Sequence, residues 1–209
     1  VTAGSIDGLT FLTENYAPFN YQKDGKVQGI SIDLLLDMFK QADTTKGLKD
    51  IKVLPWARGY KLAQVKKNTV LFSTTRTETR EKMFKWVGPI IPTKISVIAR
   101  KDRKLSIGSD KDFDKFKIGA VRDDIGELLL LKRGVNPKRI YRTNSSTNTA
   151  KMLAAGRIDM WAYEQSVAYW NLKEMGENPD DYEVVSVLEE SQLYFAIQKD
   201  TDDGVVGEL

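Results

Sequence analysis

The sequence predicts a mixed α/β fold built from two units. Within residues 8–72, short apolar strands alternate with helical patterns, an order typical of sheets covered by helices. Residues 113–175 repeat this order of strand, turn and helix. The chain is expected to cross between the units near residues 93–96 and 190–195. We therefore expect one lobe from residues 1–94 plus 195–209, and a second lobe from residues 95–194.

The first lobe opens with an apolar strand at Gly8 to Glu14, which a turn containing Pro18 interrupts. Asp24-Gly25 predicts a hairpin turn. After Gly29, apolar residues recur at the spacing of one helical face: Ile32, Leu35, Leu36 and Phe39. The remaining elements expected in this lobe are a strand at 51–54, a helix around 60–65 and a strand at 70–72.

The second lobe is predicted to hold strands at 95–99 and 117–121, with a turn at 122–126 and a helix from Glu127. Gly156 is a stop signal for the preceding helix. Further elements are expected as follows: helices at 147–155 and 165–175, and strands at 158–163, 184–188 and 193–198. A last turn at 205–209 is too short to be stable alone.

Composition restricts the function classes. The 209 residues are 41% hydrophobic and 29% charged, as in ordinary globular proteins, and the net charge is only +3. This balance argues against a dedicated nucleic-acid binder. The sequence has no cysteine and no histidine, which excludes thiolate catalysis, Ser-His-Asp chemistry and most transition-metal sites. Binding is therefore favoured over catalysis, and no cofactor or metal site is expected.

The stretch Phe72–Pro89 is the most informative one. Ser73, Thr74 and Thr75 precede two arginines, Arg76 and Arg80. Hydroxyls and N–H groups at a helix start, with an arginine one turn later, would bind a carboxylate. The alternative is a capped surface helix, with Thr77 as N-cap and Glu81 and Lys82 exposed to solvent.

The order of motifs resembles the family 3 extracytoplasmic solute-binding proteins, the amino-acid receptors of bacterial ABC importers. The resemblance covers nearly the whole chain: Tyr16-Ala-Pro-Phe, Gly29-x-x-x-Asp33, Arg80 nine residues before Pro89, a strand followed by Arg122-x-x-x-Gly126, and Gly156-Arg-Ile-Asp159. It implies a type II periplasmic-binding-protein fold, in which each lobe is a mostly parallel sheet flanked by helices. A two-stranded hinge joins the lobes, and they trap the ligand between them.

The resemblance also implies a set of ligand-binding residues. Arg80 corresponds to the arginine that binds the ligand carboxylate, and Glu164 to the acid that holds the α-amino group. Glu164 departs from the family, which usually has Asp there. The remaining positions that match are Glu14, Tyr16, Trp56, Ser73 and Thr75 in the first lobe, and Arg122, Ile125 and Gly126 in the second.

Some of these residues have an alternative structural role. Glu164 is either a ligand for an ammonium group or part of an internal salt bridge. Arg122 either contacts the ligand or pairs with Asp123 or Asp124, and Trp56 is either pocket wall or core. Arg76 is expected at the cleft edge or between the lobes. Structural roles are expected at five further positions: packing for Trp86, Trp161 and Trp170, and capping or support for Asp33 and Asp159.

The resulting prediction is a receptor that binds an amino acid or similar zwitterion and delivers it to a membrane ABC permease. A monomer located outside the cytoplasm is expected, with its signal peptide removed and a lipid anchor left open. The alternatives are the ligand-sensing domain of a signalling receptor and an enzyme resembling cyclohexadienyl dehydratases. In such an enzyme Glu14 or Glu164 would act as general acid.

Overall fold

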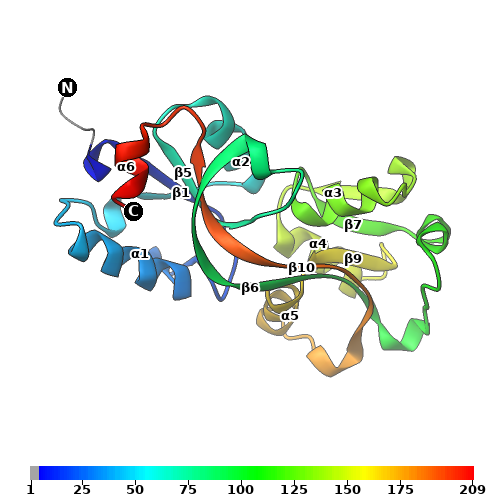
Figure 1. Cartoon of the computed structure of the whole chain (residues 1–209). Coiled ribbons are helices and arrows are strands. Elements are labelled where there is room, and N and C mark those ends of the chain that lie inside the picture. Colours follow the sequence, from blue (N-terminus) through cyan, green and yellow to red (C-terminus); the bar gives the residue numbers. More distant parts are fainter. Residues whose placement is uncertain (1–4) are drawn as a thin grey trace. The chain divides into compact units, whose positions relative to one another are not determined.

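The computed structural model describes residues 5–209, which form two compact α/β units (Figure 1). The first unit combines the described part of Val1–Pro92 with Ser191–Leu209, and the second consists of Thr93–Glu190. The first unit is therefore discontinuous in sequence. Within residues 5–209, no helix has both the length and the apolar character needed to cross a bilayer.

The sheet of the first unit is built around three parallel strands. Strand β1 (Thr10–Thr13) pairs in parallel with β4 (Ile51–Val53) on one side and with β5 (Thr69–Thr75) on the other. Strand β10 (Tyr182–Gln198) pairs with β5 in the antiparallel direction. Every residue of β5 is buried, as expected for a strand covered on both faces.

Two helices and a short C-terminal helix complete the first unit. They are α1 (Ile30–Gln41), α2 (Trp56–Val65) and α6 (Asp203–Gly207). Helix α1 buries the face predicted from its spacing, and Phe39 packs edge-on against Phe11 with ring centroids 4.9 Å apart. Val205 of α6 belongs to the same core, so packing stabilises a helix too short to persist alone.

The predicted hairpin at Asp24-Gly25 is also present. It joins β2 (Tyr21–Lys23) to β3 (Lys26–Gln28). Both turn residues have positive φ, 51° for Asp24 and 76° for Gly25, as this type of tight hairpin turn requires.

In the second unit, β7 (Ile118–Val121) lies between β8 (Ile140–Thr143) and β9 (Met160–Glu164), and all three strands are parallel. Strand β6 (Phe84–Arg100) adds to β9 in the antiparallel direction. Helix α3 (Ile125–Lys132) contributes to the main core cluster together with Met160 and Ala162. The other helices of the unit are α4 (Ser146–Ala154) and α5 (Gln165–Glu174).

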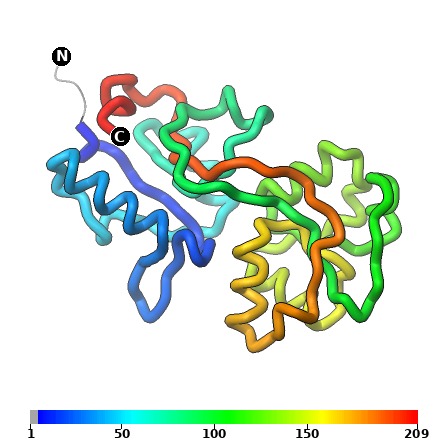
Figure 2. The backbone as a smooth tube through the Cα atoms, turned by 60° about the horizontal axis from the view of Figure 1, so that its bottom comes forward, coloured from blue at the N-terminus to red at the C-terminus, as the bar shows by residue number. Residues whose placement is uncertain are grey.

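Strands β6 and β10 are longer than the sequence predicted. Each runs for 17 residues and passes from one unit into the other, and the two are neighbours in the sheet (Figure 2, green and orange). The prediction found only their apolar portions, because Gly88-Pro89 interrupts the pattern in β6 and Glu189-Glu190 interrupts it in β10. Strand β8 was not predicted, because it is short and two of its four residues are exposed.

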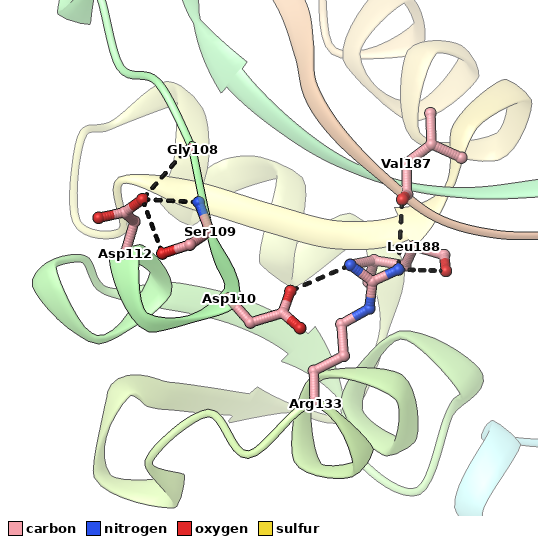
Figure 3. A network of polar contacts seen from close by, with 7 residues as sticks. All are labelled: Gly108, Ser109, Asp110, Asp112, Arg133, Val187 and Leu188. Atoms are coloured by element: carbon pink, nitrogen blue, oxygen red, sulfur yellow. Dashed lines mark hydrogen bonds and ion pairs between the residues drawn. The ribbon is translucent and has the colours of Figure 1, made fainter.

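A polar network holds the end of α3 against β10 within the second unit (Figure 3). The Arg133 guanidinium donates to the carbonyls of Leu188 at 2.6 Å and Val187 at 3.4 Å, and to the Asp110 carboxylate at 3.2 Å. Nearby, Asp112 accepts hydrogen bonds from the backbone N–H groups of Gly108 and Ser109. The Lys115 ammonium and these N–H groups lower the pKa of Asp112 to about 2.

Gly29 fixes the entry into α1. Its φ is 126°, which L side chains rarely adopt, and an added Cβ would lie 2.4 Å from the carbonyl oxygen of Phe19. The Phe19 carbonyl also accepts the hydrogen bond of the Ser31 N–H, so the backbone at this point cannot move freely. A side chain at position 29 would therefore separate α1 from the Tyr16–Phe19 turn.

We expect Gly29→Ala to lower the free energy of unfolding by at least about 2 kcal/mol, because both the φ angle and the backbone clash oppose it. Urea unfolding followed by circular dichroism measures this. Gly47→Ala is the matched control, because Gly47 has an extended backbone and an added Cβ would meet nothing within 4 Å. Equal stabilities of the two variants would contradict the assigned role of Gly29.

Candidate functional site

The predicted ligand-binding residues of the first unit gather at one edge of its sheet. Strands β1, β4 and β5 are parallel, so their carboxyl ends lie at the same edge. Glu14 and Tyr16 follow β1, and Trp56 follows β4 after a Pro55 N-cap. Thr75 is the last residue of β5. Topology therefore brings together residues that lie far apart in sequence.

Together with Arg80, these residues of the first unit form a candidate half-site. Arg80 is its central residue. It lies five residues after β5 and is only 1% exposed. Its Nη1 donates to the Thr75 carbonyl at 3.2 Å. Its guanidinium carbon lies 5.2 Å from the ring centroid of Trp56 and 4.9 Å from that of Tyr60. These two rings, one helical turn apart on α2, are stacked with centroids 5.3 Å apart.

The remaining donors of Arg80 define the chemistry of the half-site. Its Nε and Nη2 are buried and have no hydrogen-bond partner among the described residues, and no acid pairs with it there. Arginine remains charged at any physiological pH, so it cannot relieve its burial by losing a proton. Cation–π contact offsets only about 0.5–2 kcal/mol of the desolvation. Two adjacent N–H donors on a buried guanidinium match the two oxygens of a carboxylate.

Ser73 lies two residues before the end of β5 and has an unusual backbone. Its φ is 57°, and the pairing register between β5 and β10 shifts at this point. Its hydroxyl donates to the Ser31 hydroxyl of α1 at 2.8 Å. The left-handed conformation of a non-glycine residue stores roughly 1–3 kcal/mol of strain, a feature that clusters at functional sites.

Glu14 and Tyr16 lie in the turn after β1. Tyr16 is 2% exposed and forms a β-bridge with Asn20, and its ring centroid lies 5.7 Å from that of Phe19. The Asn20 amide donates to the Glu14 carbonyl at 2.9 Å, so this residue holds the turn in place. Glu14 itself is half-buried.

The structure corrects one expectation about this region. No α-helix begins after Thr75; a turn leads instead into a 3-10 segment at Glu81–Met83. Arg76 is engaged within the unit, since its Nε and Nη2 donate to the Glu81 carboxylate at 2.8 and 2.6 Å. Its guanidinium also lies over the Trp86 and Tyr194 rings. The helix prediction was wrong because hydroxyl and arginine residues suit a turn as well as a helix start.

In the second unit, the carboxyl ends of β7, β8 and β9 likewise share one edge. Arg122 directly follows β7, is exposed, and forms no ion pair with Asp123, Asp124 or any other described residue. Its N–H donates to the Thr143 carbonyl at 3.0 Å, which fixes the backbone at the end of β8. The Arg122 side chain is thus presented at this edge.

Glu164 ends β9 and caps α5. Its Oε2 accepts from the Val167 N–H at 2.8 Å and its Oε1 from the Lys94 N–H at 3.4 Å, and the residue is 2% exposed. Burial raises the pKa of Glu164, and the backbone hydrogen bonds oppose this effect. No salt bridge joins Glu164 to another described residue, so the alternative role in an internal ion pair is not seen there. Capping uses one acceptor position on each oxygen and leaves others available.

Gly126 and Ile125 begin α3. An added Cβ at Gly126 would lie 2.3 Å from the Ala162 carbonyl oxygen, so the structure gives this glycine a packing role against β9. The resemblance also implies a ligand contact at this glycine, which its packing role does not exclude. Ile125 is 1% exposed and belongs to the core cluster of the unit.

Tyr60 is the residue of the half-site that sequence analysis did not select, although it touches the Arg80 guanidinium. The signal that would have found it is its spacing from Trp56, because residues four apart on a helix share a face. No cluster of three or more potential metal-binding side chains occurs in the part of the chain that the structure describes.

This architecture is that of the type II periplasmic-binding-protein fold. The profile of the bacterial extracellular solute-binding proteins, family 3, matches residues 9–136. The chain belongs to this family, as its motifs predicted. No match is found among curated protein sequences.

Solved structures support the fold at low sequence identity. An ABC uptake transporter substrate-binding protein from Streptococcus pneumoniae with bound histidine has a TM-score of 0.82 at 18% identity, covering 96% of this chain and 82% of that one. The Gly52Ala mutant of arginine-bound ArgBP from T. maritima has a TM-score of 0.78 at 19% identity, covering 96% and 92%. A histidine kinase sensor domain with similarity to periplasmic binding proteins has a TM-score of 0.78 at 17% identity, covering 95% and 86%.

The raised pKa of Glu164 makes a prediction about stability. The ordinary value is 4.5, and the native state holds the proton more tightly than the unfolded state. The contribution of Glu164 to stability is therefore fully present below pH 4.5 and is lost as the pH rises through the raised pKa. Glu164→Gln retains an oxygen that can cap α5 but does not ionise.

We accordingly expect the stability of Glu164→Gln relative to the wild type to increase between pH 4 and pH 7, as measured by urea unfolding across roughly this range. Asp180→Gln, a change at an exposed acid in the same unit, is the control and should show no such trend. A relative stability of Glu164→Gln that falls with pH would show that the native state favours the ionised carboxylate.

Proposed function

We propose that this protein is an extracytoplasmic receptor that captures an amino acid or a similar small zwitterion. The observation that carries the proposal is the buried guanidinium of Arg80, with Nε and Nη2 lacking partners among the described residues. A ligand carboxylate supplies both the negative charge and two acceptors in one plane. The family is one of extracellular solute-binding proteins, which agrees with this role.

The surroundings of Arg80 favour a carboxylate on a small organic molecule. Trp56 and Tyr60 shield the guanidinium, and Thr75 holds its third nitrogen, so its orientation is fixed before ligand arrives. A preorganised donor pair loses little conformational entropy on binding. We assign the contact with the ligand side chain to Trp56 and Tyr16, which follow the carboxyl ends of β4 and β1.

Glu164 is proposed to bind the ligand ammonium. Its carboxylate is buried and has no cationic side chain as partner among the described residues, so an ammonium group would stabilise its ionised form. Arg122 and the backbone at Gly126 complete the proposed contacts of the second unit. In this proposal the ligand engages both units, and its greater affinity for a closed state drives hinge closure along β6 and β10.

We further propose that the loaded receptor delivers its ligand to a membrane ABC permease and acts as a monomer without catalytic activity. Two structures of similar fold hold amino acids, histidine in one and arginine in the other. Binding without catalysis also fits a chain with no histidine and no cysteine, in which only carboxylates, Lys or Tyr remain for acid–base chemistry.

A second candidate is the ligand-sensing domain of a signalling receptor. It is favoured by one specific observation, the similar fold of a histidine kinase sensor domain. The genomic sequence downstream of Leu209 separates the two candidates. A transmembrane helix followed by a kinase domain would support sensing and contradict delivery to a permease.

Ligand capture is tested by thermal shift with a panel of amino acids. A ligand at about 100 times its Kd should stabilise the native state by about 2.7 kcal/mol. Arg80→Met should abolish this stabilisation, because it removes both free donors but retains an apolar side chain under the rings. Arg58→Ala is the matched control on α2, since Arg58 is exposed and lies outside the half-site.

Two outcomes would contradict the assignment. If no zwitterion stabilises the protein while another polar metabolite does, the ligand class is wrong. If Arg80→Met unfolds cooperatively and still gains the full stabilisation from an amino acid, Arg80 does not bind the carboxylate.

The role of Glu164 is tested with three forms of whichever amino acid binds: the amino acid itself, its deaminated acid and its decarboxylated amine. The wild type should prefer the amino acid over the deaminated acid by at least about tenfold in Kd, as measured by calorimetry. Glu164→Gln should reduce this preference while leaving the preference for the carboxylate intact. An unchanged preference would assign the ammonium contact to another residue.

A further inference from the structure

A pocket lined only by residues of the second unit differs in character from the two half-sites. Its volume is about 630 Å³, a size typical of small-molecule sites. The end of β8, one side of α4 and the ends of neighbouring loops form its walls. The lining residues are Arg122, Arg142, Thr143, Asn144, Asn148, Lys151, Met152, Ala155 and Arg157.

The lining is strongly positive. It contains four cationic side chains and no acid. Arg142 is paired with the buried carboxylate of Glu127, which lies outside the lining. Lys151 and Arg157 are exposed and have no ion pair or side-chain hydrogen bond with a residue in the described part of the chain, and the same holds for Arg122. Three uncompensated charges therefore converge on one cavity.

Such a convergence has a physical consequence. Like charges around a concave surface repel one another, and the low-dielectric walls focus their potential toward the cavity. A multiply charged anion removes the repulsion and gains several contacts at once. Asn144 and Asn148 add exposed amide side chains that are able to hydrogen-bond its oxygens.

We propose that this pocket binds a small polyanion, carrying at least two phosphate or carboxylate groups. A single oxyanion would fill only a small part of 630 Å³ and reach few of the four cations. The proposal does not depend on the amino-acid site. Arg122 is common to both proposals, whereas Arg142, Lys151 and Arg157 belong only to this pocket.

The test is calorimetric titration with inorganic pyrophosphate and, separately, with citrate at constant ionic strength. Saturable binding to the wild type is expected for at least one of them, and the tighter one identifies phosphate or carboxylate as the preferred group. Lys151→Gln/Arg157→Gln should weaken it by about tenfold or more. Both substitutions retain polar side chains on exposed positions, so the fold should be unaffected.

Lys111→Gln/Lys138→Gln is the matched control. It also removes two positive charges from exposed positions of the same unit, but these positions lie outside the pocket. The Kd for the anion should therefore stay within about twofold of the wild type. Equal weakening in both double variants, or no saturable binding of either anion, would overturn the proposal. Arg80→Met should bind the anion as the wild type does, so failure here and failure of amino-acid capture can be distinguished.

Discussion

The buried charge of Arg80 is the constraint on which the proposed site depends. A guanidinium at 1% exposure can persist only where the fold holds it from several sides. Here the Thr75 carbonyl, at the end of β5, and two stacked rings from α2 provide that support. The remaining donors are left for a partner that carries the opposite charge. In the proposed site, stability of the unit and recognition of the ligand would thus be linked through one side chain.

Parallel strands explain how such distant residues meet. In each unit three parallel strands end at a common edge, and the segments after them supply the proposed contacts. The two half-sites have opposite character. The first presents a buried cation, Arg80, and the second a buried acid, Glu164, whose pKa is raised by its burial. Each group is unfavourable by itself in the folded unit, and a zwitterion carries the complementary charge for both.

Much of this fold could be predicted from the sequence. Apolar residues at helical spacing predicted α1, and the turn residues Asp24-Gly25 predicted the hairpin. The family motifs selected Arg80 as a candidate ligand-binding residue, and the structure shows its guanidinium buried. The prediction failed where one local pattern suits two structures. The hydroxyl and arginine residues after Phe72 indicated a helix start, yet β5 continues to Thr75 and a turn follows.

Other features depend on packing that no linear pattern contains. Glu164 caps a helix, and Gly126 makes room for the Ala162 carbonyl, whereas the sequence predicted neither role. Tyr60 reaches Arg80 only because α2 lies beside the segment after β5. The basic pocket of the second unit likewise draws its cations from the turn after β7, from β8, from α4 and from the loop after α4, so no single stretch of sequence reveals it.

The discontinuous first unit has a consequence for synthesis. Its core includes Phe195 and Ile197 of β10 and Val205 of α6, and β10 covers one edge of the otherwise exposed strand β5. These residues leave the ribosome after Thr93–Glu190, which is continuous and is therefore complete earlier. The second unit can therefore fold while the first still lacks part of its core. The first unit, which holds Arg80, therefore completes its core only after β10 and α6 have been synthesised.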